Sequence, residues 1–257
     1  MRSILPIIFF LIGFFPSLSF AQNPAPIPLN KHYFEIDPED SINHVFNKLV
    51  SYSKDSVKLE RIFTLTNKVN RIIRTFPPKD DFKEKIIEQY DAYGNLEWKS
   101  TINQANSKYL TTYFFDGQQV GQVLHEGNNK YQIMRSGEQE PREVVLNDFE
   151  PNPRTPQKDW NQFLNKKIIS SRTHFPKEHQ TIYVAVYVNE NGKATSVEWA
   201  NPLDTDEIFA NLFLEAVREW DHNFAPALDP FGNPVGKWRN FHLHLGGPSV
   251  INTVVFK

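Results

Sequence analysis

Paired histidines are the first residues in this sequence whose types and spacing suggest chemistry. His242 and His244 alternate along one predicted strand, so both imidazoles lie on the same face and form a candidate pair of metal ligands. A metal site needs further ligands, and none lies at a close spacing in the sequence. We therefore predict no metal site, and a solvent-facing histidine pair beside Lys237 and Arg239.

Acidic residues form a second cluster, at Asp204, Asp206 and Glu207. Their spacing is that of a capping box with Asp204 in the capping position, and negative charge is favourable at a helix N-terminus. The sequence has no Gly-x-Ser-x-Gly, P-loop or His-Glu-x-x-His motif, and no cysteine. We therefore predict that the protein is not an enzyme and binds no cofactor. The enzyme hypothesis would require a Ser, a His and an acid to converge in one pocket.

Residues 1–21 have the pattern of a secretory signal peptide. Arg2 supplies a positive charge, residues 4–15 are mostly apolar, and small side chains precede the predicted cleavage site between Ala21 and Gln22. This pattern predicts export to the periplasm. The alternative is an uncleaved anchor in the inner membrane, but the apolar run is shorter than the roughly 20 residues of a spanning helix.

The composition excludes several classes of function. A net charge of −2 gives no electrostatic basis for binding nucleic acid. The absence of cysteine excludes disulfides, thiol catalysis and a lipid-anchored cysteine at the mature N-terminus. No second apolar run is long enough to cross a membrane, so membrane contact is expected only if the N-terminal segment is uncleaved.

The first half of the chain changes its hydrophobic period near residue 58. Residues 22–57 predict a Pro-rich leader and a short helix, because apolar residues recur at helical spacing after Ser41, a plausible N-cap. Residues 58–148 predict an antiparallel β-hairpin domain, since short strand-like runs alternate with turns. Asp116-Gly117 is the strongest turn signal, because both positions of such a turn need a positive φ.

Two of these turns share a local pattern. An aromatic residue precedes an Asp and a Gly follows it at Tyr90-Asp91-Ala92-Tyr93-Gly94 and at Phe115-Asp116-Gly117. This pattern resembles the Tyr-x-x-x-Gly hairpin repeats of MORN-like proteins. An ordinary antiparallel sheet is the alternative. The aromatic face could also bind a partner, which keeps a structural or assembly protein of the envelope as one hypothesis.

Residues 149–157 predict a Pro-rich linker, and residues 158–257 predict a separate C-terminal domain. Helical spacing at residues 159–169, with Asp159 as N-cap, is followed by strands at 182–188 and 194–199. A second helix and a strand near residues 238–245 complete the order helix, β-hairpin, helix, β-strand. The predicted fold class is therefore α+β, with an N-terminal antiparallel β-meander followed by this C-terminal domain.

Short motifs follow one another along this C-terminal domain. They are Trp160-x-x-Phe163 before Phe175-Pro176, Val184-x-Val186-x-Val188-Asn-Glu-Asn-Gly192, Ala216-Val217-x-x-Trp220, Phe224-Ala-Pro226-Ala227 and Gly232-Asn-Pro234-Val235. In this order they resemble the TonB C-terminal domain family. The chain departs from the family at Gln180-Thr181, where a glycine is usual, and in the N-terminal apolar run, which contains no His.

The resemblance implies that one sheet edge binds an extended peptide from an outer-membrane TonB-dependent receptor as an added strand. The expected partner-binding edge consists of Lys237, Trp238, Arg239, Asn240, Phe241, His242, Leu243, His244 and Leu245. We expect the apolar tail, residues 250–256, to pair with that edge. The predicted function is a periplasmic TonB-like binding protein in envelope transport. The alternative is a membrane-anchored TonB energy transducer, if the N-terminal segment is uncleaved.

Overall fold

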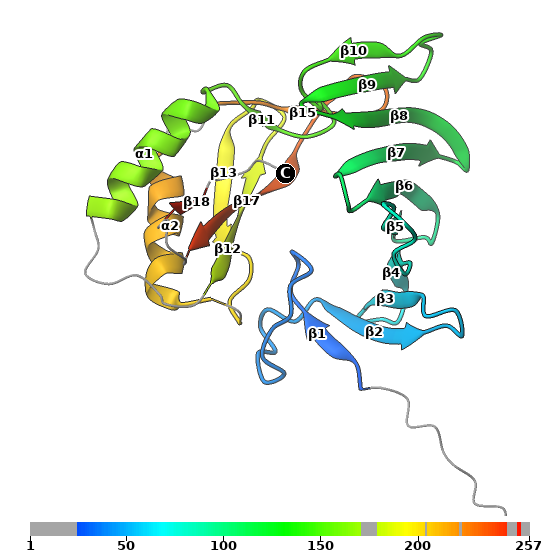
Figure 1. The fold of residues 1–257 in the computed structure, drawn as a ribbon, viewed down its shortest axis with the longest axis horizontal. Coiled ribbons are helices and arrows are strands. Elements are labelled where there is room, and N and C mark those ends of the chain that lie inside the picture. Colours follow the sequence, from blue (N-terminus) through cyan, green and yellow to red (C-terminus); the bar gives the residue numbers. More distant parts are fainter. Residues whose placement is uncertain (1–24, 171–178, 204, 221–222, 246–250, 253–257) are drawn as a thin grey trace, which may run out of the picture.

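The computed structural model describes residues 25–170, 179–203, 205–220, 223–245 and 251–252. A ten-stranded antiparallel sheet comes first in the chain, and a four-stranded sheet with two helices follows (Figure 1). The large sheet curves, and its inner face is turned toward the four-stranded sheet. The two helices lie on the opposite side of the four-stranded sheet.

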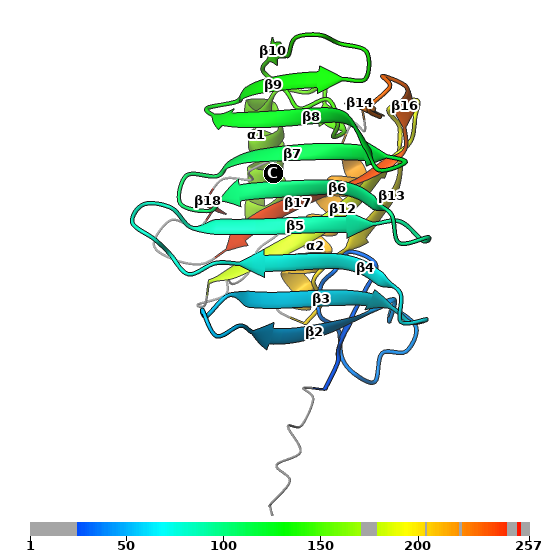
Figure 2. The same ribbon diagram turned by 90° about the vertical axis from the view of Figure 1, so that its right-hand side faces the viewer.

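The strands of the large sheet follow one another in chain order, each paired with its neighbours in antiparallel fashion (Figure 2). Short turns connect most of them. At the β7–β8 turn both Asp116 (φ 49°) and Gly117 (φ 73°) have the positive φ that this kind of turn requires. The strands are β1 (Ile27–Leu29), β2 (Phe46–Tyr52), β3 (Lys58–Thr64), β4 (Val69–Thr75), β5 (Glu84–Tyr90), β6 (Leu96–Asn103), β7 (Lys108–Phe115), β8 (Gln118–Gly127), β9 (Lys130–Arg135) and β10 (Arg142–Val144).

The short helix predicted after Ser41 is wrong. Residues 46–52 form strand β2, which pairs with β1 on one side and with β3 over seven residue pairs on the other. The predicted leader is also folded from Ile27 onward, and Leu29 and Ile36 are buried. Pairing with two neighbouring strands outweighs the local helical spacing, because intrinsic propensity is a weak preference.

The C-terminal part contains a four-stranded antiparallel sheet in the order β13-β12-β17-β18. Helices α1 and α2 pack against each other, and α2 packs on β12 and β13. Four two-residue strands form two further pairs, β11 with β14 and β15 with β16. The bounds are β11 (Asn152–Pro153), α1 (Gln157–Ser170), β12 (Gln180–Val188), β13 (Ala194–Trp199), α2 (Glu207–Glu219), β14 (Phe224–Ala225), β15 (Ala227–Leu228), β16 (Pro234–Val235), β17 (Lys237–Leu245) and β18 (Ile251–Asn252).

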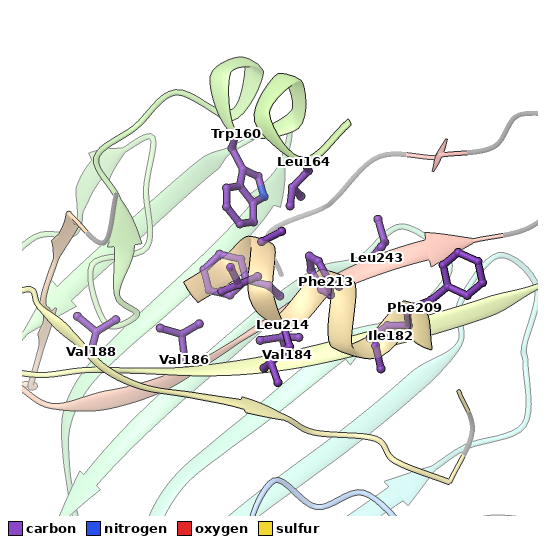
Figure 3. Close-up of a cluster of buried hydrophobic side chains, with 14 of the residues drawn as sticks. Trp160, Leu164, Ile182, Val184, Val186, Val188, Phe209, Phe213, Leu214 and Leu243 are labelled. Atoms are coloured by element: carbon purple, nitrogen blue, oxygen red, sulfur yellow. The ribbon is translucent and has the colours of Figure 1, made fainter. Parts of the chain in front are cut away.

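The main hydrophobic core lies between the four-stranded sheet and the two helices (Figure 3). Alternate residues of β12 point into it, since side chains of a strand alternate between its faces. Phe213 of α2 and Leu164 of α1 are almost fully buried in this core. The four aliphatic residues that β12 contributes are Ile182, Val184, Val186 and Val188.

The predicted α+β fold class with a TonB-like C-terminal domain is wrong for this chain. The structure is mostly β, dominated by the ten-stranded antiparallel sheet. In the described part of the chain, helical structure is confined to α1, with 14 residues, and α2, with 13 residues. Residues predicted as leader and helix add strands β1 and β2 to the large sheet, so strands predominate over helices.

The predicted helix caps also differ from the observed ones. Asp206 caps α2, because its carboxylate accepts hydrogen bonds from the N–H groups of Ile208 and Phe209. Asp204, the predicted cap, lies outside the described residues. Asp159 lies inside α1, which begins two residues earlier at Gln157.

Two groups of contacts join the large sheet to the C-terminal part. At the β1 end, the Asn30 side chain donates to the carbonyl of Ala200 at 2.8 Å, and Phe34 packs against Tyr183. At the β9 end, the Arg135 guanidinium binds Asp148 at 2.5 Å and the carbonyl of Asp229 at 3.2 Å. The two parts therefore meet at both ends of the curved sheet (Figure 1).

The first residues of the segment predicted as a linker, 149–152, are packed against the rest of the chain, whereas Arg154 and Pro156 are exposed. Phe149 is 2% exposed and stacks on Tyr113 of the large sheet. The side chain of Asn152 is buried and donates to the carbonyls of Asn147 and Glu150, both at 2.8 Å. Because this segment contacts both parts, it forms a wall between them.

Candidate functional site

One row of cross-strand neighbours runs over the inner face of the large sheet. Directly opposite residues of adjacent strands share a face, and the register places five residues from β5 to β9 in one continuous row. Three members are aromatic, and His125 stacks on Tyr131 with a ring-centroid distance of 4.7 Å. We call this set the pocket row; it consists of Lys85, Ile102, Tyr109, His125 and Tyr131.

The pocket row forms one wall of a cavity of about 1000 Å³. Residues 145–157 form a second wall, and Arg239 of β17 contributes from the small sheet. We call this cavity the junction pocket, because both parts of the molecule line it. Its volume lies at the upper end of the range of small-molecule sites, roughly 300–1000 Å³.

Internal hydrogen bonds hold the polar wall of the junction pocket in place. The Asn147 side chain donates to the hydroxyl of Tyr109 at 3.3 Å and accepts from the N–H of Phe149 at 3.0 Å. Arg239 donates to the side-chain oxygen of Asn152 at 3.2 Å and to the carbonyl of Pro151. These bonds connect β7, β17 and the segment between the two parts, so the pocket is largely preformed.

The ring of His125 has a defined tautomer when it is neutral. Its Nδ1 lies 3.1 Å from the carbonyl oxygen of Ser107, and a carbonyl oxygen only accepts, so Nδ1 carries the proton. Nε2 of the neutral ring is then a hydrogen-bond acceptor. The junction pocket thus offers acceptors as well as the donors of its amides and cations.

Burial changes the acidity of several pocket groups. It raises the pKa of Tyr109 well above its usual value, so the phenol stays protonated and neutral at physiological pH. Burial also lowers the pKa of Lys85. The negative charge of Glu60 raises this pKa, and the positive charges of Lys58 and Arg71 lower it, but burial has the largest effect. It lowers the pKa of Arg239 as well. A charged side chain is therefore costly in this pocket, so the numbers of positive and negative side chains that line it indicate the charge of a ligand that would bind there.

The predicted partner-binding residues, 237–245, form strand β17. This strand pairs with β12 over nine residue pairs, from Gln180↔Leu245 to Val188↔Lys237. On the other side it pairs with β18 at His244↔Asn252 and Leu245↔Ile251. The described part of the tail therefore pairs with the end of the predicted edge, and the remaining tail residues lie outside the described ones.

Side chains of β17 alternate between two environments. Lys237 binds Glu150 at 2.7 Å, and Phe241 and Leu243 are buried in the core. On the other face, Trp238 contacts the rings of His32 and Tyr187. Asn240 lies opposite Ala185 on that second face.

The prediction that the histidine pair faces solvent is wrong. His242 is 6% exposed, and its ring lies 4.8 Å from that of His244. Nδ1 of His244 lies 2.8 Å from the hydroxyl of Thr181. Across the residues that the structure describes, no three His, Cys, Asp or Glu side chains are grouped as metal ligands.

The predicted signal peptide and its cleavage site, Ala21-Gln22, lie outside the described residues. Within the described residues, neither helix has the length and apolar character that a membrane span requires. Cleavage, export and the anchored alternative therefore stay predictions.

Sequence patterns did not reveal the junction pocket. Its walls come from segments that lie up to 154 positions apart, from Lys85 to Arg239, and no local motif marks them. The sequence offered one indication of it, because Tyr109 and Tyr131 each lie in a strand-like run. The predicted edge strand does contribute Arg239, whereas the acidic cluster near α2 contributes no residue.

Comparisons with family models, with curated proteins and with solved structures give no match for this chain. The resemblances to the TonB and MORN-like families therefore stay predictions.

Proposed function

We propose that this chain is an exported, non-catalytic binding protein that holds its ligand in the junction pocket. The observation that carries the proposal is the construction of the pocket. A cavity of about 1000 Å³ lies between the inner face of the large sheet and the segment that leads to the small sheet. Preformed cavities that lie between two parts of a chain and combine apolar or aromatic walls with a few placed polar groups are preferred sites for ligands.

A binding role accounts for the chemistry of the pocket better than a catalytic one. Burial raises the pKa of Tyr109 and of Tyr131, so both phenols stay protonated. Among the described residues, no serine or threonine hydroxyl is hydrogen-bonded to Nε2 of His125. The one carboxylate that lines the pocket, Glu150, is paired with Lys237. Within the described part of the pocket, no nucleophile is bonded to a base that a third group orients.

A thermal-shift screen of the full chain against a mixed library of small metabolites tests this proposal. We expect at least one compound to raise the melting temperature, because a ligand that binds only the folded state stabilises it. Gln104→Trp, which places an indole at the pocket mouth, should abolish the shift. Gln118→Trp is the matched control, since Gln118 begins β8 at the opposite end from His125.

Two outcomes would contradict the proposal. Equal shifts in Gln104→Trp and Gln118→Trp would place the ligand elsewhere. Conversion of the bound compound, detected by mass spectrometry, would show catalysis rather than binding.

Strand addition to β17 is a second candidate function, in which the partner is an outer-membrane receptor segment. One observation favours it: β18 pairs with two of the nine residues of β17. A photo-crosslinking residue at Asn240 should capture a receptor in intact cells, and the same residue at Lys99 on the large sheet should not. Capture of equal amounts at both positions would refute this candidate.

Export is part of both candidates and has its own test. N-terminal sequencing of the mature protein should give Gln22 as the first residue. A start at Met1 would instead support the anchored alternative, in which the chain works at the inner membrane.

A further inference from the structure

The junction pocket carries more positive than negative charge. Lys85, Arg154 and Arg239 line it, whereas Glu150 is the one carboxylate among the lining residues. Glu150 is already 2.7 Å from the ammonium of Lys237, which does not line the pocket. Among the described residues, neither Lys85 nor Arg154 forms an ion pair with a carboxylate.

Part of this positive charge is withdrawn from water. Lys85 is half-buried, and burial lowers its pKa, which shows that the ammonium form is penalised where it stands. The charge of Glu60 offsets only part of this penalty, so a bound anion would lower the remaining cost in free energy. The charge balance therefore favours a negatively charged ligand.

The aromatic members of the pocket row favour a ligand with a ring. Tyr109, His125 and Tyr131 stand side by side on three adjacent strands, with ring-centroid distances of 5.1 and 4.7 Å between neighbours. Because His125 and Tyr131 stack on each other at an interplanar angle of 24°, the row presents ring edges and the outer ring faces at its ends. This gives a semi-polar aromatic surface against which a sugar ring can pack. One row of this length suits a ligand with more than one ring.

Carboxamide side chains form the mouth of the pocket. Gln104, Asn128 and Asn129 are exposed lining residues, and among described residues their side chains make no hydrogen bond. A carboxamide donates and accepts at once, as the neighbouring hydroxyls of a sugar do. Aromatic rings, carboxamides and surplus positive charge occur together in this one cavity.

We propose that the junction pocket binds an acidic oligosaccharide, whose carboxylates lie against Lys85 and Arg239 and whose sugar rings pack on the pocket row. This inference rests on the proposed function, since it requires the pocket to be a binding site. It adds the chemical class of the ligand.

Isothermal titration of the full chain with three probes tests the inference. Trigalacturonate is the acidic saccharide, maltotriose is a neutral saccharide of the same length, and citrate is an acid without a ring. We expect trigalacturonate to bind at least about tenfold more tightly than either other probe, and more weakly as salt is added.

Variants connect this binding to the pocket. Lys85→Gln should weaken trigalacturonate binding about tenfold, because a charge-assisted contact is lost. Lys99→Gln is the matched control, since Lys99 lies opposite Glu88 and Thr112 on the other face of the same sheet. Tyr131→Leu should weaken binding without changing its salt dependence. The melting temperature of each variant shows whether it is folded.

Several results would overturn the inference. Equal binding of maltotriose would remove the role of charge, and equal binding of citrate would remove the role of the rings. Equal losses in Lys85→Gln and Lys99→Gln would indicate a nonspecific effect of charge. A third result is that none of the three probes binds, while a library compound stabilises the unmodified chain but not Gln104→Trp. In that case the ligand class is wrong and the pocket remains the site. If no compound depends on Gln104, both proposals fail.

Discussion

Asp206 accepts hydrogen bonds from the N–H groups of Ile208 and Phe209, at 2.9 and 3.3 Å, in the first turn of α2. Those N–H groups have no partner within the helix, so the carboxylate satisfies them. The residue type and the helix start were predictable from the sequence. The choice between Asp204 and Asp206 depends on where the chain leaves β13, which local spacing does not encode.

Replacing Asp206 with alanine tests this cap. Asp206→Ala should lower the free energy of unfolding by about 1 kcal/mol, the usual cost of losing an N-cap. Asp206→Asn should lose much less, because asparagine caps equally well. Urea unfolding of both variants measures the difference, and equal losses would show that the charge rather than the hydrogen bonds matters.

His32 connects the two parts of the molecule, and its position affects stability. Its Nε2 lies 2.9 Å from the carboxylate of Glu198, and its ring packs against Trp238. Burial lowers the pKa of His32, despite the opposing effects of the hydrogen bond and the charge of Glu198. The unfolded chain, with a histidine pKa near 6.5, therefore binds a proton more readily than the folded one.

This difference gives a stability that depends on pH. The stabilisation is present above pH 6.5 and is lost as the pH falls toward and below the folded pKa, because the buried ring must then be protonated. The free energy of unfolding should therefore decrease on acidification from pH 7. In the His32→Gln variant, this decrease with falling pH should be less steep. Urea unfolding at several pH values measures this slope. An unchanged slope in His32→Gln would assign the effect to other groups.

At the scale of elements, the turns were more predictable than the strand partners. Asp116-Gly117 has two adjacent positive φ values, as its sequence indicates. The strand character of β2 was not predictable, because its residues fit helical spacing and acquire their partners only from β1 and β3. Contacts such as that between His32 and Glu198 join residues 166 positions apart, and no local pattern encodes them.

The hairpin between β12 and β13 depends on Gly192. Its φ is +76°, and an added Cβ would lie 2.2 Å from the carbonyl oxygen of Phe224 in β14. Gly94 is a matched position, since its φ is +91° but nothing lies within 4 Å of an added Cβ. The two glycines therefore separate the cost of backbone strain from the cost of crowding.

Alanine at each position should destabilise by different amounts. Gly94→Ala should cost about 1–2 kcal/mol, from the left-handed backbone alone. Gly192→Ala should cost about 1–3 kcal/mol more, because the hairpin must move away from β14. Urea denaturation gives both values. Equal losses would mean that β14 yields easily and does not fix the hairpin.

At the scale of the whole molecule, contacts at both ends of the curved sheet join it to the small sheet. Asn30 and His32 make them at one end. At the other end, Arg135 donates to the carbonyl of Asp229. Lys237 donates to the carbonyl of Phe149, whose ring stacks on Tyr113 of the large sheet. The packed residues 149–152 continue the second group. The chain is therefore expected to behave as one cooperative unit, although its sequence predicts two domains separated by a linker.

Unfolding experiments can test this cooperativity. Far-ultraviolet circular dichroism and tryptophan fluorescence should report one coincident urea transition, since each part loses contacts when the other unfolds. Asn30→Ala leaves the buried carbonyl of Ala200 without this donor, and should lower the midpoint of both probes together. Two separate transitions would show that the parts are stable independently.

The most direct test of the junction pocket as the binding site is nuclear magnetic resonance of the full chain with labelled tyrosine and histidine rings. The probe is trigalacturonate or, should it not bind, the compound that stabilises the chain most. We predict that the ring resonances of Tyr109, His125 and Tyr131 shift on binding, while those of Tyr93, which is 91% exposed, do not. Shifts at Tyr183 and His242 instead, with the pocket rings unchanged, would place the site at the small sheet and contradict the account.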